Sequence, residues 1–159
     1  MTDLAQEVGN LLRRQGLTLG VVESATGGLI SHLLTNVLGS SDYYKGSVTA
    51  YNNEVKTKIL GVKEDTINKY GAVSYHVAEE MAMGGRKILA SDICLADTGI
   101  AGPGGATLEK PVGLFYIGLS HQVGTYSQQQ DFRGNREQNK LDAAEAALGW
   151  LKEYLVGLK

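Results

Sequence analysis

Cysteine, proline and net charge are scarce in this sequence, and each scarcity excludes a class of protein. The 159 residues include one cysteine, Cys94, and two prolines. A single cysteine can form no disulfide within the chain and no cysteine metal site, which favours a reducing, cytoplasmic environment. The formal net charge is only −2 at pH 7. We therefore expect no binding to nucleic acid and none to an anionic membrane.

Long apolar runs are missing as well. No stretch approaches the ~18 consecutive apolar residues of a membrane span, and residues 1–12 are polar and amphipathic, unlike a signal peptide. We expect neither secretion nor a transmembrane segment. The composition, 43% hydrophobic and 20% charged, is that of an ordered globular protein. A chain of this length is the size of one domain, so residues 1–159 are expected to form a single domain.

Hydrophobic periodicity divides the chain into helices that alternate with strands. Helices are predicted over 3–15, 29–37, 54–60, 63–70, 74–90 and 138–156. Strands are predicted over 17–23, 46–51, 112–120 and 125–132, with another inside 91–98. This alternation predicts an α/β fold in which three layers, α/β/α, enclose a mixed, mostly parallel sheet. Ligands of such sheets bind at the carboxyl ends of the strands.

Glycine is abundant, with 21 residues, and two of them help to form the first candidate site. Ser24 follows the expected strand and precedes a helix N-terminus, where free N–H groups and the helix dipole favour negative charge. The segment 23–28 (ESATGG) could therefore stabilise the oxyanion of a serine nucleophile, or bind a phosphate. In the alternative interpretation, Ser24 or Thr26 caps the helix while Gly27 and Gly28 form the turn.

A nucleophilic serine needs a base, and lysine is a better candidate here than histidine. His32, His76 and His121 fall inside a helix, near a helix start and at a tight turn, where packing or surface roles are commoner. Lys56 is expected in the first turn of a helix that Asn52 or Asn53 can cap, and the positive helix end there disfavours an ammonium group. Tyr51 would end the preceding strand. An exposed lysine and a core tyrosine are the structural alternative.

Two further segments could bind an anion. The glycine-rich segment 99–105 can direct several N–H groups at one point, although a tight connection needs glycines too. Arg133 or Arg136 could pair with a phosphate, or could remain a solvated charge. Asp97 lies inside a buried-strand pattern, where a carboxylate needs a partner.

Seven segments, in this order, resemble the C-terminal domain of the competence/damage-inducible protein CinA. They cover nearly the whole chain: residues 23–28 (ESATGG), 39–41 (GSS), 51–56 (YNNEVK), 60–62 (LGV), 71–74 (GAVS), 98–105 (TGIAGPGG) and 110–113 (KPVG). The resemblance implies one CinA C-terminal-like amidohydrolase domain over 1–159, in a stand-alone form without the family's larger N-terminal domain.

The resemblance also implies an activity and its residues. The family hydrolyses the carboxamide of nicotinamide mononucleotide to nicotinate mononucleotide and ammonia, in pyridine nucleotide recycling, with neither a metal nor another cofactor. Ser24, Tyr51 and Lys56 match its catalytic serine, tyrosine and lysine, and Arg136 matches its arginine better than Arg133 does. The remaining substrate-binding residues are expected to be Thr26, Gly27, Gly28, Gly102, Gly104 and Gly105. A small-molecule nucleotide is the expected partner, and a homo-oligomer, with a dimer favoured, is the expected assembly.

Two residues depart from the family pattern. Ala25 stands where a cysteine is usual, and Asp97 stands where a small or apolar residue is usual, beside a loop expected to bind phosphate. A catalytically inactive relative that binds a nucleotide or a protein is therefore the second hypothesis. A DNA-associated competence factor is a third, which the sequence pI of about 5.9 opposes.

Overall fold

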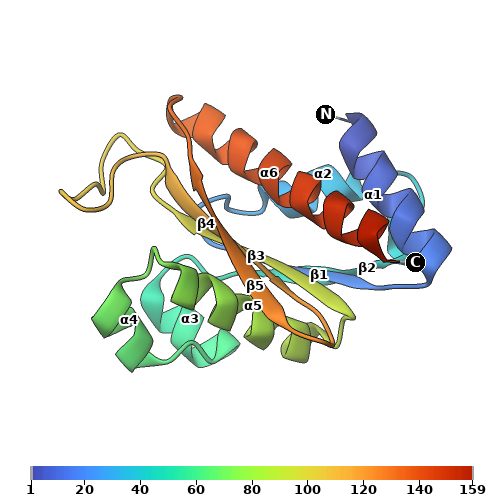
Figure 1. Cartoon of the computed structure of the whole chain (residues 1–159), viewed down its shortest axis with the longest axis horizontal. Helices are drawn as coiled ribbons and strands as arrows, with labels where there is room; N and C mark the ends of the chain where they lie inside the picture. Colours follow the sequence, from blue (N-terminus) through green and yellow to red (C-terminus); the bar gives the residue numbers. More distant parts are fainter. Residues whose placement is uncertain (1, 159) are drawn as a thin grey trace.

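Five strands form one sheet with helices on both of its faces (Figure 1). The computed structural model describes residues 2–158. Its strands are β1 (Leu19–Glu23), β2 (Tyr44–Thr49), β3 (Ile93–Gly99), β4 (Leu114–Ser120) and β5 (Thr125–Asp131). Its helices are α1 (Thr2–Gln15), α2 (Leu29–Thr35), α3 (Asn53–Leu60), α4 (Glu64–Tyr70), α5 (Tyr75–Leu89) and α6 (Arg136–Gly157), with a short 3-10 helix, η1, at Ser40–Asp42. The predicted α/β/α architecture is confirmed.

The sheet is mixed because its strands are connected in two ways. In the order β2-β1-β3-β4-β5, β1 pairs in parallel with β2 and with β3, and helices connect these strands. β4 runs antiparallel to β3 and to β5, and only a tight turn separates β4 from β5. β1 leads to β2 on one side, and the chain then crosses to β3 on the other. The carboxyl ends of β1 and β3 therefore mark the point where the strand order reverses, which is the usual place for a ligand in such sheets.

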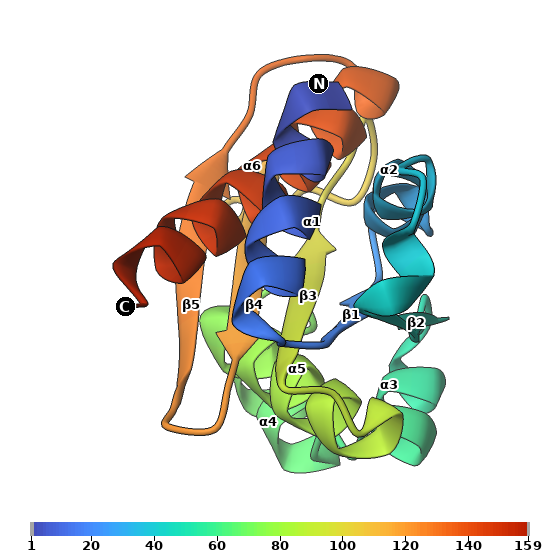
Figure 2. The ribbon, with the colours of Figure 1, turned by 90° about the vertical axis from the view of Figure 1, so that its right-hand side faces the viewer.

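Two apolar clusters attach the helices to the sheet. Figures 1 and 2 show α1, α2 and α6 on one side of the sheet and α3, α4 and α5 on the other. The first cluster includes Leu12, Leu95 and Leu148, and the second includes Val22 and Met81. Both faces of β1 and β3 are thus covered, which explains why these strands are apolar runs rather than alternating ones. Among residues 2–158, no helix has both the length and the apolar character needed to cross a membrane.

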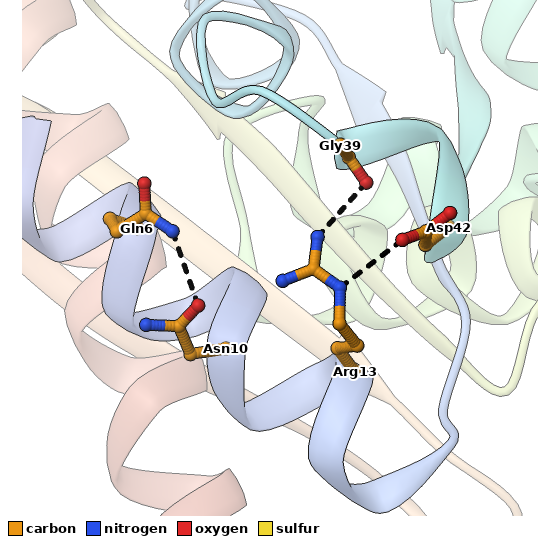
Figure 3. A network of polar contacts seen from close by, with 5 residues as sticks. All are labelled: Gln6, Asn10, Arg13, Gly39 and Asp42. Carbon is orange, nitrogen blue, oxygen red and sulfur yellow. Dashed lines mark hydrogen bonds and ion pairs between the residues drawn. The ribbon is translucent and has the colours of Figure 1, made fainter.

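A polar network on the surface connects α1 to the segment before β2 (Figure 3). The Arg13 guanidinium donates to the Gly39 carbonyl oxygen at 3.1 Å and to the Asp42 carboxylate at 3.2 Å. Within α1, the Gln6 side chain donates to the Asn10 side chain, which lies one helical turn later. These groups are exposed to solvent, so we assign the network less than about 1 kcal/mol of stability.

Several predicted boundaries differ from the structure by one or two residues, and two of these differences concern candidate site residues. The strand expected over 46–51 ends at Thr49, because its neighbour β1 ends at Glu23 in register with Thr49 and leaves later residues without a strand partner. Tyr51 consequently lies in the loop before α3. The final helix begins at Arg136 rather than residue 138, because the Asn135 side chain caps it two residues earlier than expected.

The close approach of α5 to β4 yields a stability prediction. A methyl group on Gly118 would lie 2.4 Å from the Ala78 carbonyl oxygen. We therefore expect Gly118→Ala to lower the free energy of unfolding by about 1–3 kcal/mol or more, as overpacking does. Gly149, in α6, is the matched control, because a methyl group there meets nothing within 4 Å. Gly149→Ala should be neutral or stabilising by about 1 kcal/mol at most. Urea unfolding of the two variants tests this, and equal effects would contradict the packing described.

Candidate active site

A cavity of about 420 Å³ lies at the carboxyl ends of β1 and β3. Its lining comes from the turn after β1, the start of α3, the segment before α5, the loop after β3 and the first residue of α6. Seven of the predicted site residues line it together: Ser24, Tyr51, Lys56, Gly102, Gly104, Gly105 and Arg136. None of the three histidines does. Arg133 lines a separate depression beside Pro111 and Asp131, so it does not share the cavity with Arg136.

Ser24 does not cap α2. It follows β1, is only 7% exposed, and its hydroxyl makes no hydrogen bond within residues 2–158. The capping group is the buried carboxylate of Glu23, which accepts hydrogen bonds from the amides of Gly28, Ile30 and Ser31. The structural alternative, in which Ser24 or Thr26 caps the helix, is therefore wrong. The Ser24 hydroxyl remains available to a ligand in the cavity.

The other residues of this turn were expected to bind substrate, and the structure does not support that role. The Thr26 amide donates to Asp97, the Gly27 amide to the Ser24 carbonyl oxygen, and the Gly28 amide to Glu23. None of these three residues lines the cavity. Ala25 is the exception: it lines the cavity, and its N–H has no acceptor among the described residues. The residue that follows Ser24 therefore offers one amide without an acceptor in the described chain.

Lys56 is almost completely buried, with 2% of its surface exposed. It lies in α3, whose N-cap is Asn52, while Asn53 is the first helical residue and lines the cavity. The Lys56 Nζ donates to the Tyr51 carbonyl oxygen at 2.9 Å, and no carboxylate forms an ion pair with it in the described part of the chain. Burial lowers the pKa of Lys56, and the charge of Asp97 opposes that shift. Deprotonating Lys56 to a neutral amine therefore costs less free energy than deprotonating a lysine on the surface.

Arg136 connects two walls of the cavity. One guanidinium nitrogen donates to the Gly102 carbonyl oxygen at 2.7 Å, and another donates to the Tyr51 hydroxyl at 3.1 Å. The Tyr51 side chain is 60% exposed and contacts Arg136, whereas the Tyr51 backbone carbonyl holds Lys56. Tyr51 is thus neither the core residue of the structural alternative nor a direct hydroxyl partner of the lysine.

The loop after β3 presents unused backbone donors to the cavity. The amides of Ala101, Gly102, Gly104 and Gly105 have no acceptor among residues 2–158. Gly102 has φ +87, and a methyl group there would lie 2.4 Å from the Val112 side chain, so only glycine fits this path. Buried Asn139 donates to the Ala101 carbonyl oxygen from α6 and holds the loop. Sequence reasoning missed Asn139 because an asparagine inside a helix carries no distinguishing pattern.

Asp97 does not face the glycine loop as a repelling charge. It is completely buried, and its carboxyl oxygens accept hydrogen bonds from the amides of Ser24 and Thr26, at 3.0 and 3.1 Å. Burial raises its pKa to about 6, and the nearby charge of Glu23 adds to the rise.

Within residues 2–158, no group of three or more His, Cys, Asp or Glu side chains could hold a metal ion.

The fold and cavity define an α/β domain with a polar site at the reversal of strand order, containing a serine, a buried lysine, an arginine and free loop amides. Residues 1–155 match the family described as CinA C-terminal domain, and the chain belongs to that family.

Individual members of this family are similar to the chain in sequence and in structure. A competence-damage inducible protein of Halothermothrix orenii is 50% identical over 97% of this chain, and a CinA-like protein of Desulfotalea psychrophila is 48% identical over 96%. This chain spans only 38% and 37% of those two proteins. The crystal structure of competence damage-inducible protein A from Klebsiella pneumoniae is 28% identical and superposes with a TM-score of 0.96, covering 99% of this chain and 98% of that one.

The buried carboxyl of Asp97 makes stability depend on pH. The folded chain retains the Asp97 proton up to a pKa of about 6, whereas the unfolded chain releases it near the ordinary aspartate pKa of 3.8. Because the folded state binds more protons between these values, the contribution of Asp97 to stability falls as pH rises through that window. Relative to Asp97→Asn, which does not titrate, the free energy of unfolding should fall by on the order of 2–3 kcal/mol between pH 4 and pH 7.5. Urea unfolding at both pH values measures this, and a difference that is independent of pH would refute it.

Proposed function

We propose that this chain is an amidohydrolase that deamidates nicotinamide mononucleotide to nicotinate mononucleotide and ammonia. The observation that carries the proposal is a buried lysine that has no carboxylate partner among the described residues, in the same cavity as a serine hydroxyl that makes no hydrogen bond to them. Family membership supports a CinA-type protein, and the chemistry of these residues supports the more specific activity.

Lys56 acts as the base. An ammonium group has three N–H donors, but the only acceptor of the Lys56 Nζ among the described residues is the Tyr51 carbonyl oxygen. A neutral amine can keep that hydrogen bond and direct its lone pair at the Ser24 hydroxyl. Ser24 then attacks the carboxamide carbon as its proton passes to Lys56, and the Ala25 N–H stabilises the oxyanion.

The intermediate collapses when Lys56 returns that proton to the carboxamide nitrogen. The C–N bond breaks, ammonia leaves, and the nicotinoyl group remains as an ester on Ser24. Water then attacks the ester carbon and gives its proton to Lys56. The ester C–O bond breaks, Lys56 returns the proton to Ser24, and the carboxylic acid product departs and loses its remaining proton to solvent.

The phosphate of the substrate binds at the opposite wall. The free amides of Gly102, Gly104 and Gly105 are suited to phosphate oxygens, and Arg136 supplies the positive charge. The Arg136 contact with Tyr51 relates the phosphate end of the site to the segment that holds Lys56. This division explains why a mononucleotide, rather than free nicotinamide, is the proposed substrate.

Ammonia release from nicotinamide mononucleotide and from free nicotinamide, measured side by side, tests the function. We expect release from the mononucleotide and far less from nicotinamide. Ser24→Ala should lower kcat at least about 1,000-fold and leave the affinity for the mononucleotide within about threefold, because the hydroxyl acts mainly in the transition state. Substantial turnover by Ser24→Ala would refute covalent catalysis. Binding without ammonia release by the native chain would favour the inactive nucleotide-binding alternative.

Arg136 and Arg133 form a matched pair for the phosphate site, because only Arg136 lines the cavity. Removing a charge-assisted contact costs about 1.5–3 kcal/mol, so Arg136→Ala should raise KM for the mononucleotide about 10- to 100-fold. Arg133→Ala should leave KM within about twofold. Steady-state kinetics of both variants measure this, and equal effects would contradict the assignment of Arg136.

A further inference from the structure

The Asp97 carboxyl group accepts hydrogen bonds from the backbone that follows the end of β1. The last pair between β1 and β3 joins Val22 to Ala96, so Asp97 is the first residue of β3 beyond the ladder. Its carboxyl group accepts hydrogen bonds from the amides of Ser24 and Thr26. The amide between them, that of Ala25, is the one left without an acceptor in the described chain. Asp97 therefore fixes both peptide groups that flank the free donor.

We propose that Asp97, together with Thr26, is a positioning residue that holds the Ser24 hydroxyl and the Ala25 N–H in place for attack on the substrate carbonyl. This role rests on the proposed function. Asp97 itself does not line the cavity, so it acts through the turn rather than on the substrate. Displacing reacting groups by about 1 Å can lower a rate about 100-fold, so a turn that holds these groups rigidly can raise the rate without contacting the substrate.

The Thr26 hydroxyl lies between the carboxyl groups of Asp97 and Glu23. Its hydroxyl oxygen lies 2.5 Å from an Asp97 carboxyl oxygen and 2.6 Å from a Glu23 carboxyl oxygen. One hydroxyl proton can serve only one of these two contacts, so the other contact needs a proton on a carboxyl group. Glu23 already accepts four other donors, from Gly28, Ile30 and both the amide and hydroxyl of Ser31, whereas Asp97 accepts two amides. Glu23 is thus the more fully hydrogen-bonded of the two carboxyl groups, and the Thr26 hydroxyl between them connects Asp97 to it.

Asp97 is buried, and merely filling space there does not require a carboxyl group. A carboxyl group in a completely buried position costs free energy that an apolar side chain of similar size would not. Its hydrogen bonds go to the serine turn and to Thr26, and to no other part of the described chain. The cost is therefore incurred at the nucleophile itself and at the residue two positions after it, which is where positioning is needed.

Two substitutions test the role. Asp97→Asn keeps the volume but turns an NH2 group toward one of the donors, and Thr26→Val removes the hydroxyl while keeping the shape. Both should lower kcat about 10- to 100-fold and leave KM within about twofold, because ground-state binding does not use the turn. Thr26→Ser restores the hydroxyl and should keep kcat within about threefold. Ser120→Ala is the control, because Ser120 is a buried, hydrogen-bonded residue at the end of β4, where it pairs with Cys94 near the start of β3 and far along that strand from Asp97.

A second measurement separates this role from the proposed function. A fluorophosphonate probe, followed by intact-protein mass spectrometry, reports the reactivity of Ser24 without any nucleotide. Labelling of Asp97→Asn and Thr26→Val should slow by about the same factor as kcat, with Ser120→Ala unchanged. If the native chain is labelled but releases no ammonia from nicotinamide mononucleotide, the proposed function fails and the labelling comparison still decides the role of Asp97. Native labelling rates in folded Thr26→Val and Asp97→Asn would overturn the positioning role, as would a loss confined to KM. Should Asp97→Asn not fold, Thr26→Val decides alone.

Discussion

The backbone amides that follow β1 have no strand to pair with, and two buried carboxyl groups accept most of them. Glu23 accepts those at the start of α2, and Asp97 accepts those of Ser24 and Thr26. Buried amides without acceptors would be costly, so this end of the sheet depends on the two carboxyl groups. The donor that they leave without an acceptor in the described chain is the Ala25 N–H, on the residue that follows Ser24. The same hydrogen bonds that complete the fold therefore determine which groups a substrate can reach.

The cavity combines this rigid turn with a wall built differently. The loop after β3 follows a path that glycine permits, and the amides of Ala101, Gly102, Gly104 and Gly105 have no acceptor within the described chain. Arg136 and Asn139, both from α6, hold it in place through the carbonyl oxygens of Gly102 and Ala101. One wall thus offers a nucleophile and a base, and the other offers donors for an anion. Such a division suits a substrate with a reactive amide at one end and a phosphate at the other.

Lys56 shows how packing changes chemistry. Its side chain is buried with one carbonyl oxygen as its hydrogen-bond acceptor in the described chain, and burial lowers its pKa. A charged Asp97 would raise that pKa, so a proton on Asp97 favours the neutral amine. The turn that positions Ser24 and the charge that tunes Lys56 therefore depend on the same carboxyl group.

Local sequence determined the elements of this protein, and tertiary structure decided how its polar groups are used. Apolar periodicity and glycine positions predicted the six α-helices and five strands of the described chain, though not the short helix η1, because burying one face of a helix or both faces of a strand requires a pattern that is visible in the chain. The motifs also named Ser24, Tyr51, Lys56, the glycine loop and Arg136, which the fold then brought to one cavity. Sequence could not reveal that Glu23 rather than Ser24 caps α2, that the amides of Thr26, Gly27 and Gly28 are occupied, or that Asp97 faces the serine turn. Those outcomes depend on hydrogen bonds such as the one that joins residues 24 and 97 across the sheet. A carboxylate can accept from any donor that the fold brings within about 3 Å, so its partner is settled only when the strands are in register.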